Sequence, residues 1–452
     1  SLLSNRTESA MTHKILGGPK AWVVWSISVS FVLLVFALQS GYAITNVYVA
    51  DDLGLTLVQV GVIGSIYTWV FAIAQFASGS VLDRIGARRV LPVAAALVTL
   101  GAFFFANAPN VWVLLFAQVL LAMGASYGFI GAGVVGGQWF EPAKYGFMFA
   151  LVQLCASLGA VVGQNIINIA VQEYHWSTIM NVLGVGGIII VVLMLAFLRD
   201  ALSEDQAQAR KLVWPGFRRF FTELVDNLNA VTKQQDAWVN ALIGGATFGC
   251  MLALGVVWGP RLMVAAGLDQ STANETISFS WFGLAIGSPV LAWFSDRLKS
   301  RKKPMFLACV LQLLVILIVL VTPERSANEF AVLFFLWGFA AGGSMITFTI
   351  GMELTDKAHV GSSAALVNAT QFIAGGILMA IPGRVLAGSG LIARVAEIEA
   401  EAAETLQNYQ WSLIIYPLVL ITALLLFPFL KETYSKSAQG SERKGRTGRK
   451  SE

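Results

Sequence analysis

Long apolar segments alternate with short polar or charged segments along almost the whole chain. Most of the apolar segments contain about 18 or more residues, and a helix of that length crosses a hydrocarbon core about 30 Å thick. The pattern therefore predicts twelve membrane-spanning helices. Their predicted ranges are 21–49, 56–81, 88–107, 110–138, 143–171, 177–198, 237–263, 272–294, 304–322, 329–353, 360–383 and 409–430.

The composition supports this interpretation and excludes a soluble domain. Hydrophobic residues make up 56% of the chain and charged residues 12%, and the mean hydropathy is +0.71. A soluble domain carries about 25% charged residues. The apolar runs are continuous, whereas the strands of a membrane β-barrel alternate between apolar and polar positions. The predicted fold class is all-α integral membrane.

The distribution of Lys and Arg predicts how the helices are oriented. A polar linker, 199–236, divides the twelve spans into six and six. With the N-terminus inside, the outer loops and outer span ends hold only four of the 30 basic residues. These four are Arg261, Arg325, Arg384 and Arg394. Because basic residues concentrate on the cytoplasmic side, we expect a multi-pass protein of the inner or plasma membrane with both termini in the cytoplasm.

This topology divides the chain into five parts. We expect a cytoplasmic tail over 1–20, a six-helix bundle over 21–198, the linker 199–236 with an amphipathic helix, a second bundle over 237–430 and a basic tail over 431–452. Residues 1–10 precede Met11 and are expected to be an artificial extension. The basic segments lie beside membrane spans, so we expect them to contact membrane lipids and not nucleic acid.

The sequence does not suggest an enzyme, a metal site or a bound cofactor. Cys155, Cys250 and Cys309 all lie inside apolar spans and have no metal-ligand spacing. The three histidines are far apart in the sequence. The spans contain no arrangement of nucleophile, base and carboxylate, so no catalytic residue is assigned.

One charged segment between two apolar spans has a second, weaker copy. It contains Gly79, Asp83, Arg84, Gly86, Arg88 and Arg89. Asp83-Arg84 recurs as Asp296-Arg297, 213 residues later, and Gln153 corresponds to Asn368 at an offset of 215. Two similar offsets, each the length of six spans, indicate a duplicated chain of the kind found in secondary transporters.

The segment from Gly79 to Arg89 resembles the signature of the major facilitator superfamily, in the loop after the second span. The resemblance covers nearly the whole chain, through its six-plus-six layout. It implies two six-helix bundles in a monomer that binds a small-molecule substrate between them and works by alternating access. We expect the residues of both copies, Gly79, Asp83, Arg84, Gly86, Arg88, Arg89, Asp296 and Arg297, to form a conformational latch. The alternative is that the basic residues only anchor the topology.

In this superfamily the solute cavity is lined mainly by spans 1, 4, 7 and 10. Polar and aromatic residues in these and adjacent spans are the candidates, because polar groups inside a bilayer are costly unless they face a cavity or a partner. The predicted substrate-binding residues are Gln39, Tyr42, Thr45, Asn46, Tyr67, Tyr127, Gln153, Trp258, Arg261, Trp281, Thr347, Asn368 and Gln371. The alternative for each is a hydrogen bond within its own or a neighbouring helix.

Charged residues lie only near the span ends. Arg261 could attract an anionic substrate from the outer side, or it could simply extend to the interface. Glu353 and Asp356, at the cytoplasmic mouth of span 10, could carry protons or form a solvated pair.

Residues 67–91 are loosely similar to organic-anion transporters of the superfamily. This similarity predicts symport of a carboxylate-bearing metabolite with protons. Leu115 stands where many proton-linked members have Arg, and Gln164 follows Gly163 where drug–proton antiporters have Pro. Both departures disfavour a multidrug exporter and leave the driving ion open. An efflux antiporter and a non-transporting receptor or scaffold remain the alternatives.

Overall fold

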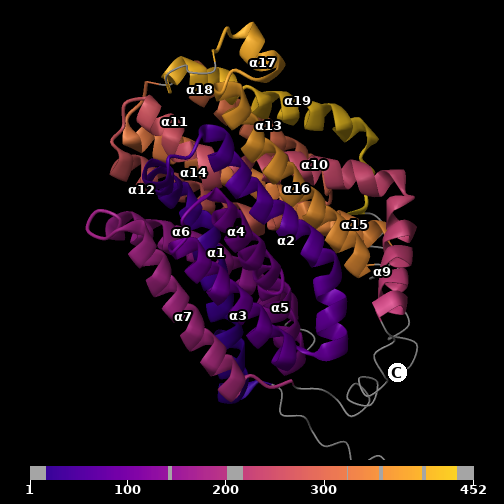
Figure 1. Cartoon of the computed structure of the whole chain (residues 1–452). Helices are drawn as coiled ribbons and strands as arrows, with labels where there is room; N and C mark the ends of the chain where they lie inside the picture. The colour runs from indigo at the N-terminus through magenta and orange to yellow at the C-terminus, as the bar shows by residue number, and fades with distance from the viewer. Residues whose placement is uncertain are drawn as a thin grey trace, which may run out of the picture.

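The computed structural model describes residues 17–140, 145–200, 217–322, 324–355, 360–399 and 404–434. The described residues form helices joined by turns, without a β-strand (Figure 1). Twelve stretches are long and apolar enough to cross a membrane. Their ends agree with the predicted spans to within a few residues in most cases, which confirms the all-α multi-pass fold.

The first six spans contain seven helices. They are α1 (Gly18–Leu53), α2 (Leu57–Ile85), α3 (Ala87–Ala106), α4 (Val111–Ala125), α5 (Gly128–Trp139), α6 (Tyr145–Ala170) and α7 (Trp176–Phe197). The fourth span, predicted as one helix, is divided into α4 and α5 at Ser126 and Tyr127. Part of the linker forms α9 (Phe217–Thr232).

The last six spans are interrupted more often. They contain α10 (Gln235–Ala253), the π-helix η2 (Leu254–Trp258), α11 (Gly259–Ala265), α12 (Gln270–Arg297), α13 (Lys302–Val321), α14 (Ala327–Ala341), the 3-10 helix η3 (Gly342–Met345), α15 (Ile346–Leu354), α16 (Val360–Leu386), α17 (Gly390–Val395), α18 (Leu406–Ser412), α19 (Ile415–Leu426) and the 3-10 helix η5 (Phe427–Phe429). The seventh and tenth spans therefore contain a π-helical and a 3-10 segment, which often mark functional positions in helices.

Polar side chains set the ends of several helices. Thr56 and Gln59 form a capping box at the start of α2, and Ser326 and Glu329 form another at the start of α14. Such boxes satisfy backbone N–H groups that have no partner inside the helix. Asp269 caps α12, and the hydrogen bond from the backbone N–H of Thr272 lowers the pKa of its carboxyl.

Small residues allow the two six-helix halves to meet along α2 and α16, which lie side by side (Figure 1). A Cβ atom on Gly383 would lie 2.5 Å from the carbonyl oxygen of Leu57, and one on Gly61 would lie 2.8 Å from that of Met379. Backbone atoms cannot move aside as the end of a flexible side chain can. Only glycine fits these two positions without a shift of the helices.

The halves also meet where α6 packs on α12 and where α1 packs on η2. We call the end of the molecule that carries α9 the linker end and the opposite end, which carries α17, the distal end (Figure 1). The distal end includes the C-terminus of α1 with Asp52, the start of α12 with Ser271 and the segment before α18 with Glu404. The linker end includes the start of α3 with Arg88, the start of α13 with Arg301 and the segment after η5 with Glu432.

Candidate functional site

Amide side chains join the two halves near the middle of the molecule. Gln164, on α6, donates through Nε2 to the carbonyl oxygens of Ser40 on α1 (2.9 Å) and Gly255 on η2 (3.1 Å). Gln164 is completely buried, so these hydrogen bonds form away from water. A single side chain therefore connects one helix of the first half to the irregular segment of the second.

A second group of amides lies closer to the distal end, between α6 and α12. Asn168 donates through Nδ2 to the backbone oxygen of Ser271 at 3.1 Å, and its Oδ1 accepts from Asn274 Nδ2 at 2.9 Å. Asn168 and Asn274 are both fully buried. These neutral groups hold the halves together at the distal end.

Arg261 is the third connection between the halves. It lies on α11, its side chain is 8% exposed, and its Nε donates to Asn46 Oδ1 on α1 at 2.9 Å. Asn46 donates through Nδ2 to the carbonyl oxygens of Tyr42 and Ala43, which turns its Oδ1 toward the guanidinium. Arg261 Nη1 also lies 3.4 Å from Oε2 of Glu404, in the loop before α18.

Some buried polar groups in this region have no hydrogen-bond partner in the described part of the chain. They include Gln39 Nε2, Tyr67 OH, Gln164 Oε1 and Trp281 Nε1. Trp281 packs edge-on against Phe36, one turn of α1 before Gln39, and a Cβ atom on Gly255 would lie 3.5 Å from its Nε1. Unsatisfied buried polar groups are costly, so these four atoms are candidates to bind a polar solute. Other atoms of this kind, such as Asn240 Oδ1 and Gln312 Oε1, lie inside the second half.

Other predicted residues meet across the halves or within the second half. Asn368 Nδ2 donates to Oε1 of Gln75, which joins α16 to α2. Gln371 Nε2 lies 3.4 Å from Thr347 Oγ1, and both are buried. The structure thus places Gln39, Asn46, Arg261, Trp281 and Asn368 along the boundary between the halves.

Several of the predicted residues form hydrogen bonds to groups in their own half of the molecule. Tyr42 OH donates to the carbonyl oxygen of Val60, Thr45 bonds to its own helix, and Trp258 Nε1 donates to the carbonyl oxygen of Met379. Gln153 Nε2 donates to Ser157 Oγ at 3.3 Å. The alternative given for each predicted residue was a hydrogen bond within its own or a neighbouring helix, and these bonds are of that kind. Tyr127 is partly buried at the break between α4 and α5.

Asn274 and Glu404 were absent from the candidates that the sequence suggested. Gln164 and Asn168 are polar candidates of the fifth span, but they were not included in the predicted substrate-binding set. The repeat offset could have indicated part of the arrangement. Asn46 and Arg261 lie 215 residues apart, the same offset as Gln153 and Asn368. Ser40 and Gly255, which share Gln164, have this offset too. Equivalent residues of two repeats meet when they lie near the axis that relates the repeats.

The predicted latch is described only in part. The side chains of Asp83 and Arg84 lie outside the described residues. Gly86 has φ 96° between α2 and α3, a backbone conformation that favours glycine. Arg88 and Arg89 are exposed, and the backbone N–H of Arg88 donates to Asp200. A Cβ atom on Gly79, a member of the expected latch, would meet nothing within 4 Å, so this position needs no glycine for packing.

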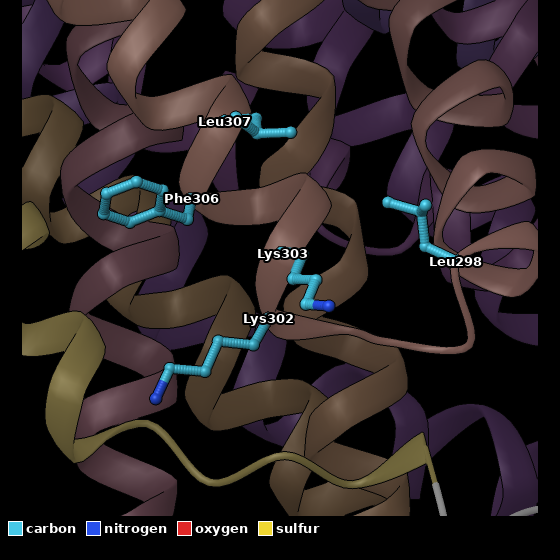
Figure 2. Close-up of a pocket in the computed structure, with 5 residues that line it drawn as sticks. All are labelled: Leu298, Lys302, Lys303, Phe306 and Leu307. Atoms are coloured by element: carbon cyan, nitrogen blue, oxygen red, sulfur yellow. The ribbon is translucent and has the colours of Figure 1, made fainter.

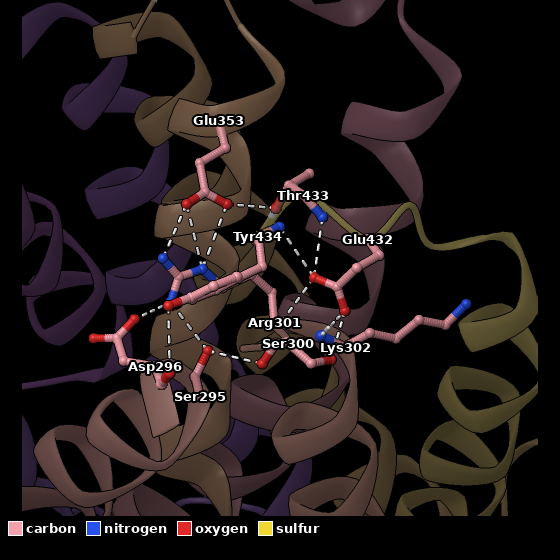
Figure 3. A network of polar contacts seen from close by, with 9 residues as sticks. All are labelled: Ser295, Asp296, Ser300, Arg301, Lys302, Glu353, Glu432, Thr433 and Tyr434. Carbon is pink, nitrogen blue, oxygen red and sulfur yellow. Dashed lines mark hydrogen bonds and ion pairs between the residues drawn. The ribbon is translucent and has the colours of Figure 1, made fainter. Parts of the chain in front are cut away.

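The second copy of the charged segment forms a network at the linker end (Figure 3). Arg301 Nη1 lies 2.6 Å from Asp296 Oδ1, and its Nη2 lies 3.0 Å from Glu353 Oε1. Arg297, the arginine expected in this role, is exposed. Arg301 makes these contacts instead, and it lies five residues after Asp296 as Arg88 lies five residues after Asp83. All members of the network belong to the second half, so the proposed latch between the halves stays a prediction.

Glu432 completes this network from the segment after η5 (Figure 3). Its carboxylate accepts from Ser300 Oγ at 2.5 Å, from the backbone N–H of Arg301 at 2.9 Å and from that of Lys302 at 3.3 Å. Burial would raise the pKa of Glu432, but these hydrogen bonds outweigh it and lower the pKa. Glu353 also accepts from Thr433, so the candidate proton site is part of a structural network. Asp356 lies outside the described residues.

A shallow hollow of about 380 Å³ lies away from the interface between the halves (Figure 2). It is lined by Leu298, Lys302, Lys303, Phe306 and Leu307. Lys302 Nζ extends toward the carbonyl oxygen of Leu430 at 3.0 Å. The hollow lies on the outer side of α13 at the linker end, so it is not part of the site between the halves.

Comparisons with known proteins agree with this architecture. The family model described as Major Facilitator Superfamily matches residues 27–379. The chain is 28% identical over 206 residues to the probable galactarate/D-glucarate transporter GudP of Bacillus subtilis (strain 168), a match that spans 44% of this chain and 45% of that protein. It is 25% identical over 440 residues to the membrane sensor protein UhpC of Escherichia coli (strain K12), covering 92% and 93% of the two chains.

A solved structure of a D-xylose–proton symporter has the same fold. Its TM-score with this chain is 0.71, the sequence identity is 12%, and the match covers 91% of this chain and 98% of that one.

Proposed function

The chain belongs to the major facilitator superfamily, and from this premise we propose that it is a secondary active transporter of a small carboxylate-bearing organic solute. The solute would cross the cell membrane by alternating access, in uptake coupled to protons. Both termini would lie in the cytoplasm, which makes the distal end the outer one. The protein would act as a monomer without a cofactor and without enzymatic activity.

The observation that carries this proposal is Arg261, a guanidinium buried between the two halves. A buried cation is costly unless an anion compensates it. Its present anion, Glu404, lies 3.4 Å away and is half exposed, which leaves the guanidinium available to a solute. Unpaired groups at Gln39, Tyr67 and Trp281 would bind the hydroxyl groups of the solute.

Sugar acids are the solutes that fit this combination of one cation and several neutral hydrogen-bonding groups. Along a helix, Asn46 lies seven residues after Gln39, a separation of about 10 Å at about 1.5 Å per residue. A six-carbon sugar acid is of similar length, so its carboxylate could reach Arg261 while its hydroxyl groups reach Gln39 and Trp281. The name of GudP points to the same class, as does that of the hexuronate transporter of Bacillus subtilis, which is 25% identical over 171 residues.

The first experiment is uptake into proteoliposomes that contain the purified protein. D-Glucarate, galactarate, a hexuronate, a hexose phosphate and a neutral hexose would be compared, with and without an inward proton gradient. We expect uptake of the sugar acids only, and faster uptake with the gradient. Uptake of the neutral hexose alone would refute the carboxylate class, and equal uptake without the gradient would refute symport.

A receptor is the second candidate, and the similarity to UhpC over 92% of the chain favours it. A receptor would bind a sugar acid or a hexose phosphate without exchanging it across the membrane. Counterflow distinguishes the two functions. A solute that stabilises the protein thermally but shows no counterflow would replace transport by sensing. An efflux antiporter would instead show solute release driven by an inward proton gradient.

A further inference from the structure

Glu404 contacts the buried Arg261 from the loop before α18. Its side chain is 49% exposed, whereas that of Arg261 is 8% exposed. Oε2 of Glu404 accepts a hydrogen bond from the hydroxyl group of Tyr409, which is itself buried. The loop therefore places the partly exposed carboxylate of Glu404 next to the buried guanidinium of Arg261.

The same guanidinium links the two halves. Arg261 Nε donates to Asn46 on α1, so Asn46, Arg261 and Glu404 form a continuous polar chain from the first half to the distal loop. The amide of Asn46 is fixed by two bonds to its own helix, so Arg261 is the movable member of this chain. Separation of the halves at the distal end would break the Asn46 bond and expose the guanidinium.

We propose that Glu404 is a built-in competitor for the carboxylate of the solute at Arg261. When the distal end opens, the solute carboxylate displaces Glu404 from the guanidinium. When the distal end closes, Glu404 returns and releases the solute carboxylate toward the linker end. This inference rests on the proposed transport of a carboxylate-bearing solute.

The exchange costs little free energy because both competitors are carboxylates. Arg261 keeps a compensating anion in either state, so no state leaves a buried cation unpaired. The present pair is long for a charge-assisted hydrogen bond, which is usually 2.7–2.9 Å, so its loss costs little. A neutral sugar cannot replace Glu404, and the loop carboxylate would therefore contribute to selection of anions.

The experiment measures solute binding and the opening of the distal end on the same purified, full-length protein in detergent. Glu404→Gln keeps the shape of the side chain and removes its charge. Glu399→Gln is the matched control, because Glu399 is an exposed glutamate of the same loop. D-Glucarate is the probe for binding, and a neutral hexose is the negative control.

Opening of the distal end is measured independently by labelling a cysteine at position 49. The substitution Val49→Cys is combined with each of the two glutamine variants. Val49 is completely buried and lies three residues after Asn46, on the same side of α1. A hydrophilic maleimide would label this cysteine when the distal end opens.

We expect Glu404→Gln to bind D-glucarate at least about 5-fold more tightly, which is the lower range of couplings between sites. In the same variant the maleimide should label Val49→Cys faster. Glu399→Gln should change neither the affinity for D-glucarate nor the labelling rate. Faster labelling with unchanged D-glucarate affinity would overturn the inference, since Glu404 would then only close the gate. Unchanged labelling and affinity would overturn it as well. If the protein without these glutamine changes binds no sugar acid, the proposed function itself has failed.

Discussion

Arg261 combines burial with charge between the two halves. Its Nε donates to Asn46, and its Nη1 contacts the carboxylate of Glu404. The guanidinium therefore makes two kinds of contact, one that joins the halves and one that binds an anion. Substitutions of Arg261 can separate the two contributions.

We predict that Arg261→Gln weakens D-glucarate binding roughly 10- to 100-fold, since a hydrogen bond to a charged group contributes about 1.5–3 kcal/mol. Arg261→Lys should restore only part of the affinity, because an ammonium cannot hold Asn46 and a carboxylate in the fixed geometry of a guanidinium. Isothermal titration on purified protein measures both. Arg394→Gln, at an exposed arginine near the same loop, should bind as the unchanged protein does. Equal loss in the Arg394 variant would remove Arg261 from the site.

Glu432 gives a second prediction at this scale. Its carboxylate binds the backbone N–H groups that begin α13, so Glu432→Gln should destabilise the protein by about 1 kcal/mol at pH 7, as loss of a helix cap does. The pKa of Glu432 is lower when the protein is folded. Its stabilisation is therefore complete above the unfolded value of about 4.3 and is lost as the pH falls through the lower, folded value.

Thermal unfolding in detergent between about pH 7 and 3 measures this difference. The two proteins should converge at the acidic end. A constant difference across the range would show that the charge of Glu432 is not responsible. Glu275→Gln, at an exposed position of α12, provides the reference.

At the scale of elements, the contact between α2 and α16 determines how closely the two halves approach each other at the distal end. Gly61 and Gly383 place backbone against backbone, and one turn after Gly61 the hydroxyl group of Ser65 donates to the carbonyl oxygen of Gly376 at 2.6 Å. Phe71 and Phe372 extend the contact, with ring centroids 4.4 Å apart. No flexible side chain at the glycine positions can absorb an added methyl group.

Gly383→Ala should therefore disfavour the closed distal end by about 1–3 kcal/mol, the usual cost of overpacking. The equilibrium would shift toward the distal-open state, and Val49→Cys would label faster with a hydrophilic maleimide. Gly186→Ala is the matched control, because a Cβ atom on Gly186 of α7 meets nothing within 4 Å. Equal labelling of both alanine variants would mean that α2 and α16 separate by another route.

The interrupted spans were not visible in the hydrophobic pattern. The span predicted at 237–263 contains the π-helix η2, and the span at 329–353 contains the 3-10 helix η3. Apolar residues continue through both segments, since a π or 3-10 turn needs the same burial as an α turn. Hydropathy therefore predicted where each span lies but not where its helix changes type.

At the scale of the whole molecule, the described cross-half hydrogen bonds run from Asn46–Arg261 and Asn168–Ser271 at the distal end to Gln75–Asn368. This arrangement is closed at the distal end. In alternating access, the site would exchange solute with the linker side in this state and with the distal side after the halves rock apart.

A disulfide that prevents this rocking should stop transport. With Asn168→Cys and Ser271→Cys, oxidation would join α6 to α12 across the halves and abolish D-glucarate counterflow, and reduction would restore it. Asn107→Cys with Asn181→Cys is the control, because these residues lie 3.1 Å apart at their side-chain atoms within one half. Counterflow that survives oxidation of the first pair would contradict rocking of the two halves.

The sequence by itself determined the twelve spans, their division into two halves and the repeat that relates them. Hydrophobic burial depends on local composition, and an offset of 215 residues can be read from the chain. Only the tertiary structure decided which polar groups meet. Gln39 and Thr45 look equally suitable in sequence, yet Thr45 bonds to its own helix while Gln39 has an unpaired buried amide nitrogen.

The reason is that contacts between the halves depend on how distant helices pack, and not on the residues beside them. Glu404 lies in a loop and carried no signal until the fold placed it against Arg261. Asn46 and Arg261 are the exception, since the repeat offset pairs them and the axis between the halves brings them into contact.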